Sequence, residues 1–245
     1  MEFSQTKLLY LEDGSKVDAK AIVLSAGEIN GKTSIVLDQT IFYAQGGGQP
    51  FDTGRIENSN GVFKVEEVRK KDGVVNHVGI FESGKFEIGG EVKLFVDSER
   101  RALNSKLHSA GHVIDAAVRN IGLKLIPGKG YHFPDGPYVE YEGEIPLENR
   151  EEIRAKLEVE VNRLISSDSE VKVQTVGYRT VEALCDFVPS YLSPADNSIR
   201  IVTVAGEFGC PCGGTHVKNI SEIGSVKIPK ISAKSGKTRV SYLLG

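Results

Sequence analysis

The chain has 245 residues, of which 40% are hydrophobic and 26% charged, and its net charge is −3. This composition is typical of a soluble globular protein with one large or two modest domains. No apolar stretch approaches the roughly 20 residues that span a bilayer. The first residues, MEFSQTKLLYLEDGSKV, lack the basic and then apolar pattern of a signal peptide. The three cysteines make a poor disulfide framework, so we expect a cytoplasmic protein without membrane partners.

Residues 1–95 are predicted to form an all-β domain. Short segments of alternating character, SIVLDQTIFYA, GVFKVEEVR and EVKLFVD, are typical of strands. Dipeptides that favour hairpin turns separate them: Asn30-Gly31, Asn60-Gly61 and Asp72-Gly73. Several short strands with regular turns favour a small β-barrel.

The pattern changes at Asp97-Ser98, where a long helix is predicted. Ser98 is the expected capping residue, and Gly122 is expected to end the helix. Apolar residues recur at spacings of three and four, which places them on one helix face. They are Leu103, Leu107, Ala110, Ile114, Ala117 and Ile121.

A second helix is predicted after Pro146, followed by further strands. Its expected buried stripe is Ile153, Leu157, Val161 and Leu164. VKVQTV, SIRIVTV, GSVKIPKIS and TRVSYLL read as strands, the last two joined by a Lys-Ser-Gly-Lys turn. Residues 96–245 are therefore expected to form an α+β domain, with two long helices packed on a mostly antiparallel sheet.

Four residues in two pairs predict a metal site. His108 and His112 are four apart on the first helix, so both project from one side of it. Cys212 and His216 are also four apart, after a predicted strand. Three imidazoles and one thiolate form a ligand set suited to zinc, although each pair alone is a weak signal.

Local sequence around these pairs limits the kind of metal site. Gly213-Gly214 is expected to let the chain turn tightly and bring Cys212 and His216 inward. Cys210 is a spare thiol that is a less favoured substitute for Cys212. Between His108 and His112 the sequence reads Ser-Ala-Gly, so the glutamate of His-Glu-x-x-His metalloproteases is absent. A closed four-ligand set favours structural zinc, but a domain of this size can bury its own core without a metal.

Basic residues gather in two places, a pattern found both on phosphate-binding surfaces and on ordinary solvated faces. From residue 225 to the last residue there are five basic residues and no acidic one. Arg100, Arg101 and Lys106 form a second basic group. The candidates for contact with nucleic-acid phosphates are Arg100, Arg101, Lys227, Lys230, Lys234, Lys237 and Arg239.

Four segments resemble a known family. HSAGH, CGGTHV and ISEIGSVKI are similar to motifs of the editing domain of alanyl-tRNA synthetase, and FYAQGGGQPFDTG resembles that family's glycine-rich segment. The arrangement is similar to that of free-standing alanyl-tRNA editing proteins of the AlaX type. The resemblance spans nearly the whole chain. It implies a zinc-dependent aminoacyl-tRNA deacylase that hydrolyses serine, or glycine, from tRNA(Ala).

The resemblance also implies roles for individual residues. His108, His112, Cys212 and His216 match the family's zinc ligands. Gly46, Gly47, Gly48 and Gln49 match its glycine-rich motif, whose simpler interpretation is a turn between strands. The family often has Gln-Lys-Gly after the first helix, whereas Gly128-Lys129-Gly130 stands here, so no role passes to that position.

Three further residues are possible members of the site. Tyr131 and His132 are candidates to line the substrate pocket, or else a packed or exposed pair. Asp115 lies on the same helix face as the two histidines, where it could orient an imidazole or act as a general base. The preferred interpretation pairs Asp115 with Arg119 four residues later.

The expected mechanism is attack of water on the ester of the tRNA 3′ end, with zinc either activating that water or positioning the substrate. No catalytic nucleophile is predicted, because no base stands beside a serine or cysteine in sequence. Two alternatives remain from the residues alone: a non-catalytic tRNA-binding module with structural zinc, and a zinc esterase for small molecules. No protein partner is predicted.

Overall fold

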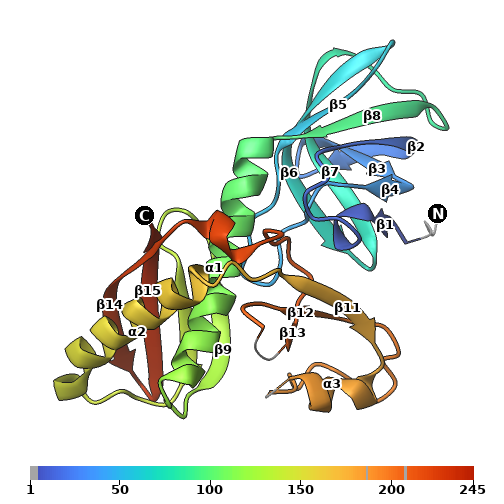
Figure 1. Ribbon diagram of the computed structural model, residues 1–245. Coiled ribbons are helices and arrows are strands. Elements are labelled where there is room, and N and C mark those ends of the chain that lie inside the picture. Colours follow the sequence, from blue (N-terminus) through green and yellow to red (C-terminus); the bar gives the residue numbers. More distant parts are fainter. Residues whose placement is uncertain (1–4, 186, 207–208) are drawn as a thin grey trace. The chain divides into compact units, whose positions relative to one another are not determined.

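The computed structural model describes residues 5–185, 187–206 and 209–245 (Figure 1). It divides into two compact units. Unit 1 comprises residues 1–46 and 50–103, and unit 2 comprises residues 47–49 and 104–245. Whether these units correspond to the predicted domains, 1–95 and 96–245, stays a prediction.

Unit 1 contains a closed six-stranded barrel, which confirms the predicted β-barrel. Two short strands, β1 (Lys7–Leu8) and β4 (Gln39–Thr40), pair in parallel. A 3-10 turn and the first two barrel strands come between them in the sequence. Around the barrel the strands follow the order β2 (Asp18–Ile29), β3 (Lys32–Leu37), β7 (Val74–Gly84), β6 (Gly61–Lys71), β5 (Gly54–Asn58) and β8 (Glu91–Val96).

Two of the three predicted hairpin turns are confirmed. Asn30-Gly31 and Asp72-Gly73 have positive φ at both positions, 50° and 76° in the first pair and 51° and 81° in the second, as the favoured two-residue turn requires. At Asn60-Gly61 the predicted hairpin is present between β5 and β6, but its turn lies one residue earlier, at Ser59-Asn60. Gly61 is already the first residue of β6, where it pairs with Asn58.

His77 is fully buried in the barrel and fully hydrogen-bonded. Its Nδ1 donates to the Ile35 carbonyl at 3.0 Å, so its Nε2 accepts from the Thr40 hydroxyl at 2.8 Å. Burial is the main cause that lowers the pKa of His77 to about 4. This histidine is therefore a neutral core residue.

Helix α1 (Ser98–Asn120) begins and ends with capping interactions. The prediction of Ser98 as the cap is wrong, because the Asp97 carboxylate accepts the Arg100 N–H at 3.1 Å and Ser98 is already helical. Gly122 ends the helix as predicted, with a φ of 79° and hydrogen bonds that form a Schellman motif. Leu103 was predicted to face the core but is 40% exposed.

Unit 2 has the predicted α+β class, but its strands form two sheets instead of one. The four-stranded antiparallel sheet has the order β14 (Val226–Lys234), β15 (Lys237–Leu244), β10 (Tyr138–Glu142) and β9 (Ile126–Tyr131). The three-stranded sheet has the order β11 (Lys172–Val176), β12 (Ile199–Thr203) and β13 (Gly209–Pro211). A short helix, α3 (Tyr178–Leu184), packs against the second sheet.

One core joins the four-stranded sheet to α1 and α2 (Arg150–Ile165), and α2 packs against β14 (Figure 1). The predicted stripe of α2 is confirmed at Leu157, Val161 and Leu164, whereas Ile153 is only half-buried. Within the described ranges, no helix has both the length and the apolar character needed to cross a membrane.

Candidate metal centre

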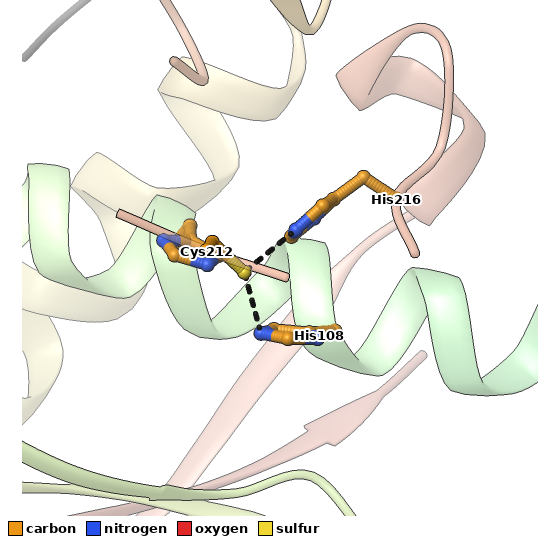
Figure 2. Close-up of side chains that lie close together, drawn as sticks. His108, Cys212 and His216 are labelled. Carbon is orange, nitrogen blue, oxygen red and sulfur yellow. Dashed lines mark hydrogen bonds between the residues drawn. The ribbon is translucent and has the colours of Figure 1, made fainter. Parts of the chain in front are cut away.

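Helix α1 and the segment after β13 bring four potential metal ligands together in unit 2. The nitrogen and sulfur atoms of His108, His112, Cys212 and His216 all lie within 4.8 Å of one another. The Cys212 Sγ is 3.5 Å from the His108 Nε2 and 3.3 Å from the His216 Nε2 (Figure 2). Around a tetrahedral ion with bonds of about 2.0–2.3 Å, ligand atoms stand about 3.3–3.8 Å apart. The cluster therefore fits a metal ion.

Gln49 fixes the orientation of His108. The Thr215 backbone N–H donates to the Gln49 Oε1 at 3.0 Å, which identifies that atom as the oxygen because an N–H can only donate. The His108 Nδ1 lies 2.7 Å from the same oxygen and so carries the proton. The Gln49 Nε2 in turn donates to the Thr215 Oγ1 at 2.9 Å. With Nδ1 protonated, the lone pair of His108 is on Nε2, which faces the Cys212 sulfur.

Gly214 is required by close packing. A Cβ at this position would lie 2.2 Å from the His108 Nδ1 and 3.0 Å from the Gln49 Oε1. The chain bends at Gly214 and brings Cys212 and His216 together as expected, but neither Gly213 nor Gly214 has a positive φ. Gly213 has no atom within 4 Å of such a Cβ, so only Gly214 has a steric reason to be glycine.

Ser109 holds the second imidazole. Its Oγ lies 3.1 Å from the His216 Nδ1 and accepts the Val217 N–H at 3.2 Å. The outer nitrogen of His216 is thus occupied, and its Nε2 faces Cys212. Two of the three histidines in the cluster have this arrangement, which is typical of metal-binding imidazoles.

Burial keeps the clustered imidazoles neutral. It is the main cause that lowers the pKa of His112 to about 4, and the nearby Arg200 cation adds to the effect. Burial is the main cause that holds the pKa values of His108 and His216 well below the ordinary range, and repulsion from neighbouring imidazoles lowers them further. Burial raises the pKa of the Cys212 thiol. Neutral imidazoles have free lone pairs at pH 7, and a bound metal would displace the thiol proton.

His132, one of the two predicted pocket residues, lies against the cluster. Its ring stacks on His108 with centroids 4.5 Å apart. The Tyr242 hydroxyl donates to the Leu107 carbonyl at 2.9 Å and therefore accepts from the His132 Nδ1 at 2.6 Å. Burial lowers the pKa of His132 to about 3. His132 is thus a neutral histidine whose Nε2 has the lone pair.

Glycines make room for the His132 ring. A Cβ at Gly111 would lie 2.4 Å from its Cε1, and one at Gly130 would lie 2.3 Å from its Nε2. The Gly111 of HSAGH and the Gly130 of the Gly-Lys-Gly segment therefore serve one side chain. The other predicted pocket residue, Tyr131, is half-buried, and its hydroxyl donates to Asp135 at 3.2 Å.

The glycine-rich motif is divided between the two units. Gly46 belongs to unit 1, where its carbonyl accepts the Tyr43 hydroxyl at 2.8 Å. Gly47 and Gly48 belong to unit 2 and have positive φ values of 53° and 78°. The Gly48 carbonyl accepts the His132 N–H at 2.8 Å, and a Cβ on Gly48 would lie 2.2 Å from the Gly130 oxygen. These glycines form the turn that brings Gln49 to His108.

Asp115 and Cys210 lie outside the ligand cluster. The Tyr141 hydroxyl donates to the Asp115 carboxylate at 2.6 Å. Burial raises the pKa of Asp115 to about 6, although the Tyr141 hydrogen bond and the Arg119 charge both lower it. Cys210 is a free thiol in β13 and is not among the four clustered ligands.

The predicted phosphate contacts differ in exposure. Arg101 is buried in unit 1, where its guanidinium binds the Asp52 carboxylate and donates to the Ile41 carbonyl at 2.6 Å. It is therefore not on the surface, where a phosphate contact requires it. Arg100 is half-buried and donates to the Phe51 carbonyl at 2.9 Å. The exposed members are Lys227, Lys230, Lys234 and Arg239, and Lys237 is half-buried.

Comparison with known proteins first defines the class. The family model of class II (A) tRNA synthetases matches residues 4–100. The model of the threonyl and alanyl tRNA synthetase second additional domain matches residues 199–241, which include Cys212 and His216 of the cluster. Two segments of the chain thus match domains found in tRNA synthetases.

Individual relatives then define the family. The alanyl-tRNA editing protein AlaX-M of Pyrococcus horikoshii is 31% identical, over 98% of this chain and 99% of its own length. The chain therefore belongs to the family of alanyl-tRNA editing proteins. AlaX-L of the same organism is also 31% identical, and this chain spans 55% of its length. An alanine–tRNA ligase of Methanococcus maripaludis is 33% identical, and this chain spans 27% of that enzyme.

Proposed function

We propose that the protein is a zinc-dependent trans-editing hydrolase that removes serine, or glycine, from mischarged tRNA(Ala). The observation that supports this most directly is the cluster of three imidazoles and one thiol with His108 oriented by Gln49. Membership of a family whose relatives are named alanyl-tRNA editing proteins gives the substrate class. The reaction takes place in the cytoplasm, where tRNA is charged.

Zinc is the proposed metal because of the donor types. Nitrogen and sulfur ligands in a tetrahedral set favour Zn²⁺ over the oxygen-preferring Mg²⁺ and Ca²⁺. When bound, Zn²⁺ acts as a Lewis acid that polarises an ester carbonyl or lowers the pKa of a water molecule. His108, His112, Cys212 and His216 are the residues that would hold it.

The chain's own groups then orient the substrate. The His132 Nε2 is a neutral acceptor beside the ligand cluster, because its Nδ1 is occupied by Tyr242. In our proposal it accepts a hydrogen bond from the substrate's amine or from the attacking water. The stack on His108 and the absence of a Cβ at Gly111 and Gly130 keep this ring in one position.

A separate editing reaction is needed because one binding pocket cannot distinguish alanine sufficiently from glycine and serine. The aminoacylation pocket of a synthetase, if shaped for alanine, cannot strongly exclude glycine, which is smaller, or serine, which only adds a hydroxyl. A site that binds the serine hydroxyl with a buried polar group rejects alanine, since that group is then left without a partner. Discrimination of about ten-thousandfold is possible in this way.

The test is a deacylation time course with seryl- and alanyl-tRNA(Ala). We expect rapid loss of serine and persistence of alanine with the wild-type protein. Cys212→Ala should slow deacylation by at least about a hundredfold, since it removes a metal ligand and not only a residue that orients one. Cys210→Ala is the matched control, because it removes a nearby thiol outside the cluster and should retain both activity and bound zinc.

Two outcomes would overturn the proposal. Intact seryl ester in the presence of zinc-loaded protein that binds tRNA would indicate a non-catalytic binding module. Equal activity on a small ester without tRNA would indicate an esterase for small molecules.

A further inference from the structure

The four-stranded sheet of unit 2 has an outer face whose side chains point away from the core with α1 and α2. Successive side chains in a strand point to opposite faces. In β10, Val139 and Tyr141 are buried and face the core. Tyr138 and Glu140, which alternate with them, are partly exposed and lie on the outer face. The outer face includes all five basic residues of the last two strands: Lys227, Lys230, Lys234, Lys237 and Arg239.

An aromatic ladder lies on this outer face, formed by Phe133, Tyr131, Tyr138 and the guanidinium of Arg239. The rings of Phe133 and Tyr131 stack at 4.5 Å with an interplanar angle of 14°. Those of Tyr131 and Tyr138, which are paired across β9 and β10, stack at 5.3 Å and 15°. The Arg239 guanidinium lies 3.8 Å from the Tyr138 ring centroid. All three rings are half-buried, so each has part of its surface in solvent.

The charges on the outer face favour an anionic partner. Glu140 and Glu142 pair with Lys237 at 3.3 and 3.1 Å, and Glu140 also pairs with Arg239 at 3.2 Å. Lys227, Lys230 and Lys234 are exposed and take part in none of the ion pairs found among the described residues. The ladder thus stands beside lysines whose charge is not balanced locally.

Unpaired nucleotides are the ligand that combines these features. Bases of single-stranded RNA stack on aromatic rings and arginine planes, while lysines bind the phosphates, and an open sheet with exposed aromatics is a recurrent platform for this. A duplex has less use for such rings, because its bases are already paired and stacked.

One residue of the aromatic ladder is adjacent in sequence to a residue that contacts the candidate metal centre. Tyr131 and His132 are consecutive, with Tyr131 on the outer face and His132 stacked on His108 on the other side. β9 is an edge strand of the sheet, so a bound chain can pass around it from one face to the other. We propose that the aromatic ladder binds the unpaired 3′ nucleotides of aminoacylated tRNA, with the lysines of β14 on their phosphates. This inference rests on the proposed function and names the part of the substrate that the ladder recognises.

The test measures binding of the zinc-loaded protein to two fluorescent RNAs by anisotropy. One is an unpaired RNA of about eight nucleotides ending in CCA, within the usual site size for single strands. The other is a blunt hairpin without unpaired 3′ nucleotides. Tyr138→Ala and Phe133→Ala should each weaken binding of the unpaired RNA about tenfold, the effect of losing one stacked base. Neither variant should change binding of the hairpin.

Matched variants separate stacking from folding and from charge. Tyr138→Phe keeps the ring and should bind like the wild type. Phe95→Ala removes a half-buried ring under Arg55 in the barrel, 4.6 Å from the guanidinium, and should have no effect on the unpaired RNA. Lys230→Ala should reduce the slope of log binding constant against log salt concentration by about 1, the value for one lost phosphate contact. The ring variants should leave that slope unchanged.

Several results would overturn the inference. Wild-type affinity of both ring variants for the unpaired RNA would do so, provided that circular dichroism and zinc content are normal. An equal loss for the hairpin would exclude recognition of unpaired nucleotides, and a changed oligomeric state with unchanged RNA binding would make this face a protein interface. The proposed function fails separately, if the wild type binds RNA through the ladder but leaves seryl-tRNA(Ala) intact.

Discussion

Histidines occur in both units, and they do different things in each. In the barrel, His77 uses both ring nitrogens for hydrogen bonds to Thr40 and Ile35, so no lone pair is left for a ligand. In unit 2, His108 and His216 each use only the outer nitrogen, and the inner nitrogen faces the Cys212 sulfur. Burial and a low pKa are common to all three. A candidate metal-binding histidine therefore differs from a core histidine in one ring nitrogen, which faces only the other residues of the cluster.

The same contrast applies to the other buried polar groups. In unit 1, the buried side chains of Arg101 and Asp52 satisfy one another. In unit 2, Gln49 and Thr215 satisfy one another, and Gln49 also holds the candidate ligand His108. Substitutions in the first group should change stability, and substitutions in the second should change metal affinity.

The largest expected effect is that of Arg101→Ala on stability. It leaves the Asp52 carboxylate, which has no solvent exposure, without its cation. Breaking a buried ion pair on one side costs about 3–5 kcal/mol. The measurement is the free energy of unfolding in urea, followed by circular dichroism. Arg100→Ala is the control and should cost less, about 1–2 kcal/mol, because one hydrogen bond to the Phe51 carbonyl and one contact with the Phe51 ring are lost and no buried charge is left unpaired. Equal costs for the two variants would contradict the assignment of Arg101 and Asp52 as a buried ion pair.

Protonation of His77 should give the next largest effect. Its pKa is about 4 when folded and 6.5 in the ordinary state, so the unfolded chain binds more protons between these values. Stability contributed by the neutral ring is present above pH 6.5 and is lost as the pH falls to 4, by about 3 kcal/mol. The comparison is the pH dependence of unfolding in the wild type and in His77→Gln, which lacks the titrating group. Parallel curves for the two proteins would show that His77 does not titrate in this range.

Gly214→Ala should remove the metal with little change in unit 1. The new Cβ would lie within 2.2 Å of the His108 ring, so the imidazole must leave its position. We expect metal affinity to fall at least about a hundredfold, measured by competition with a chelator, since a ligand itself is displaced. Gly213→Ala is a closely matched control one residue away, where nothing lies within 4 Å. A metal affinity that is equally low in both variants would assign the effect to the loop as a whole.

Gln49→Ala should have the smallest effect of the four. It removes the acceptor that fixes the His108 tautomer but leaves all four ligands in place. Loss of such an orienting partner typically lowers metal affinity about 10–100-fold. Gln39→Ala, which removes a surface hydrogen bond to the Lys20 carbonyl, is the control. Unchanged metal affinity in Gln49→Ala would mean that α1 alone positions His108.

Periodicity in the sequence predicted most of the elements that position the site. The spacing of apolar residues predicted α1 and α2, and the glycine at position 122 predicted where α1 ends. The helical repeat also predicted that His108 and His112 share one side. The error at Ser98 was of one residue, because Asp97 and Ser98 are both good capping residues and only the observed hydrogen bond distinguishes them.

Other features could not be read from local sequence. Gln49 is 59 residues from His108, and nothing in the glycine-rich segment indicates which histidine it contacts. Arg101 is charged and near other basic residues in the sequence, so it resembled a phosphate contact until its buried ion pair with Asp52 was known. The aromatic ladder depends on the pairing of Tyr131 with Tyr138 and on Arg239 from another strand.

The sequence by itself determined the classes of the elements and the types of the candidate ligands, since helical and strand periods and donor chemistry are local properties. Only the tertiary structure decided which nitrogen of His108 faces the cluster, why residue 214 must be glycine and that Arg101 is buried. Each of these depends on contacts between residues that are far apart in the chain, and such contacts are fixed by packing and by the need of every buried polar group for a partner.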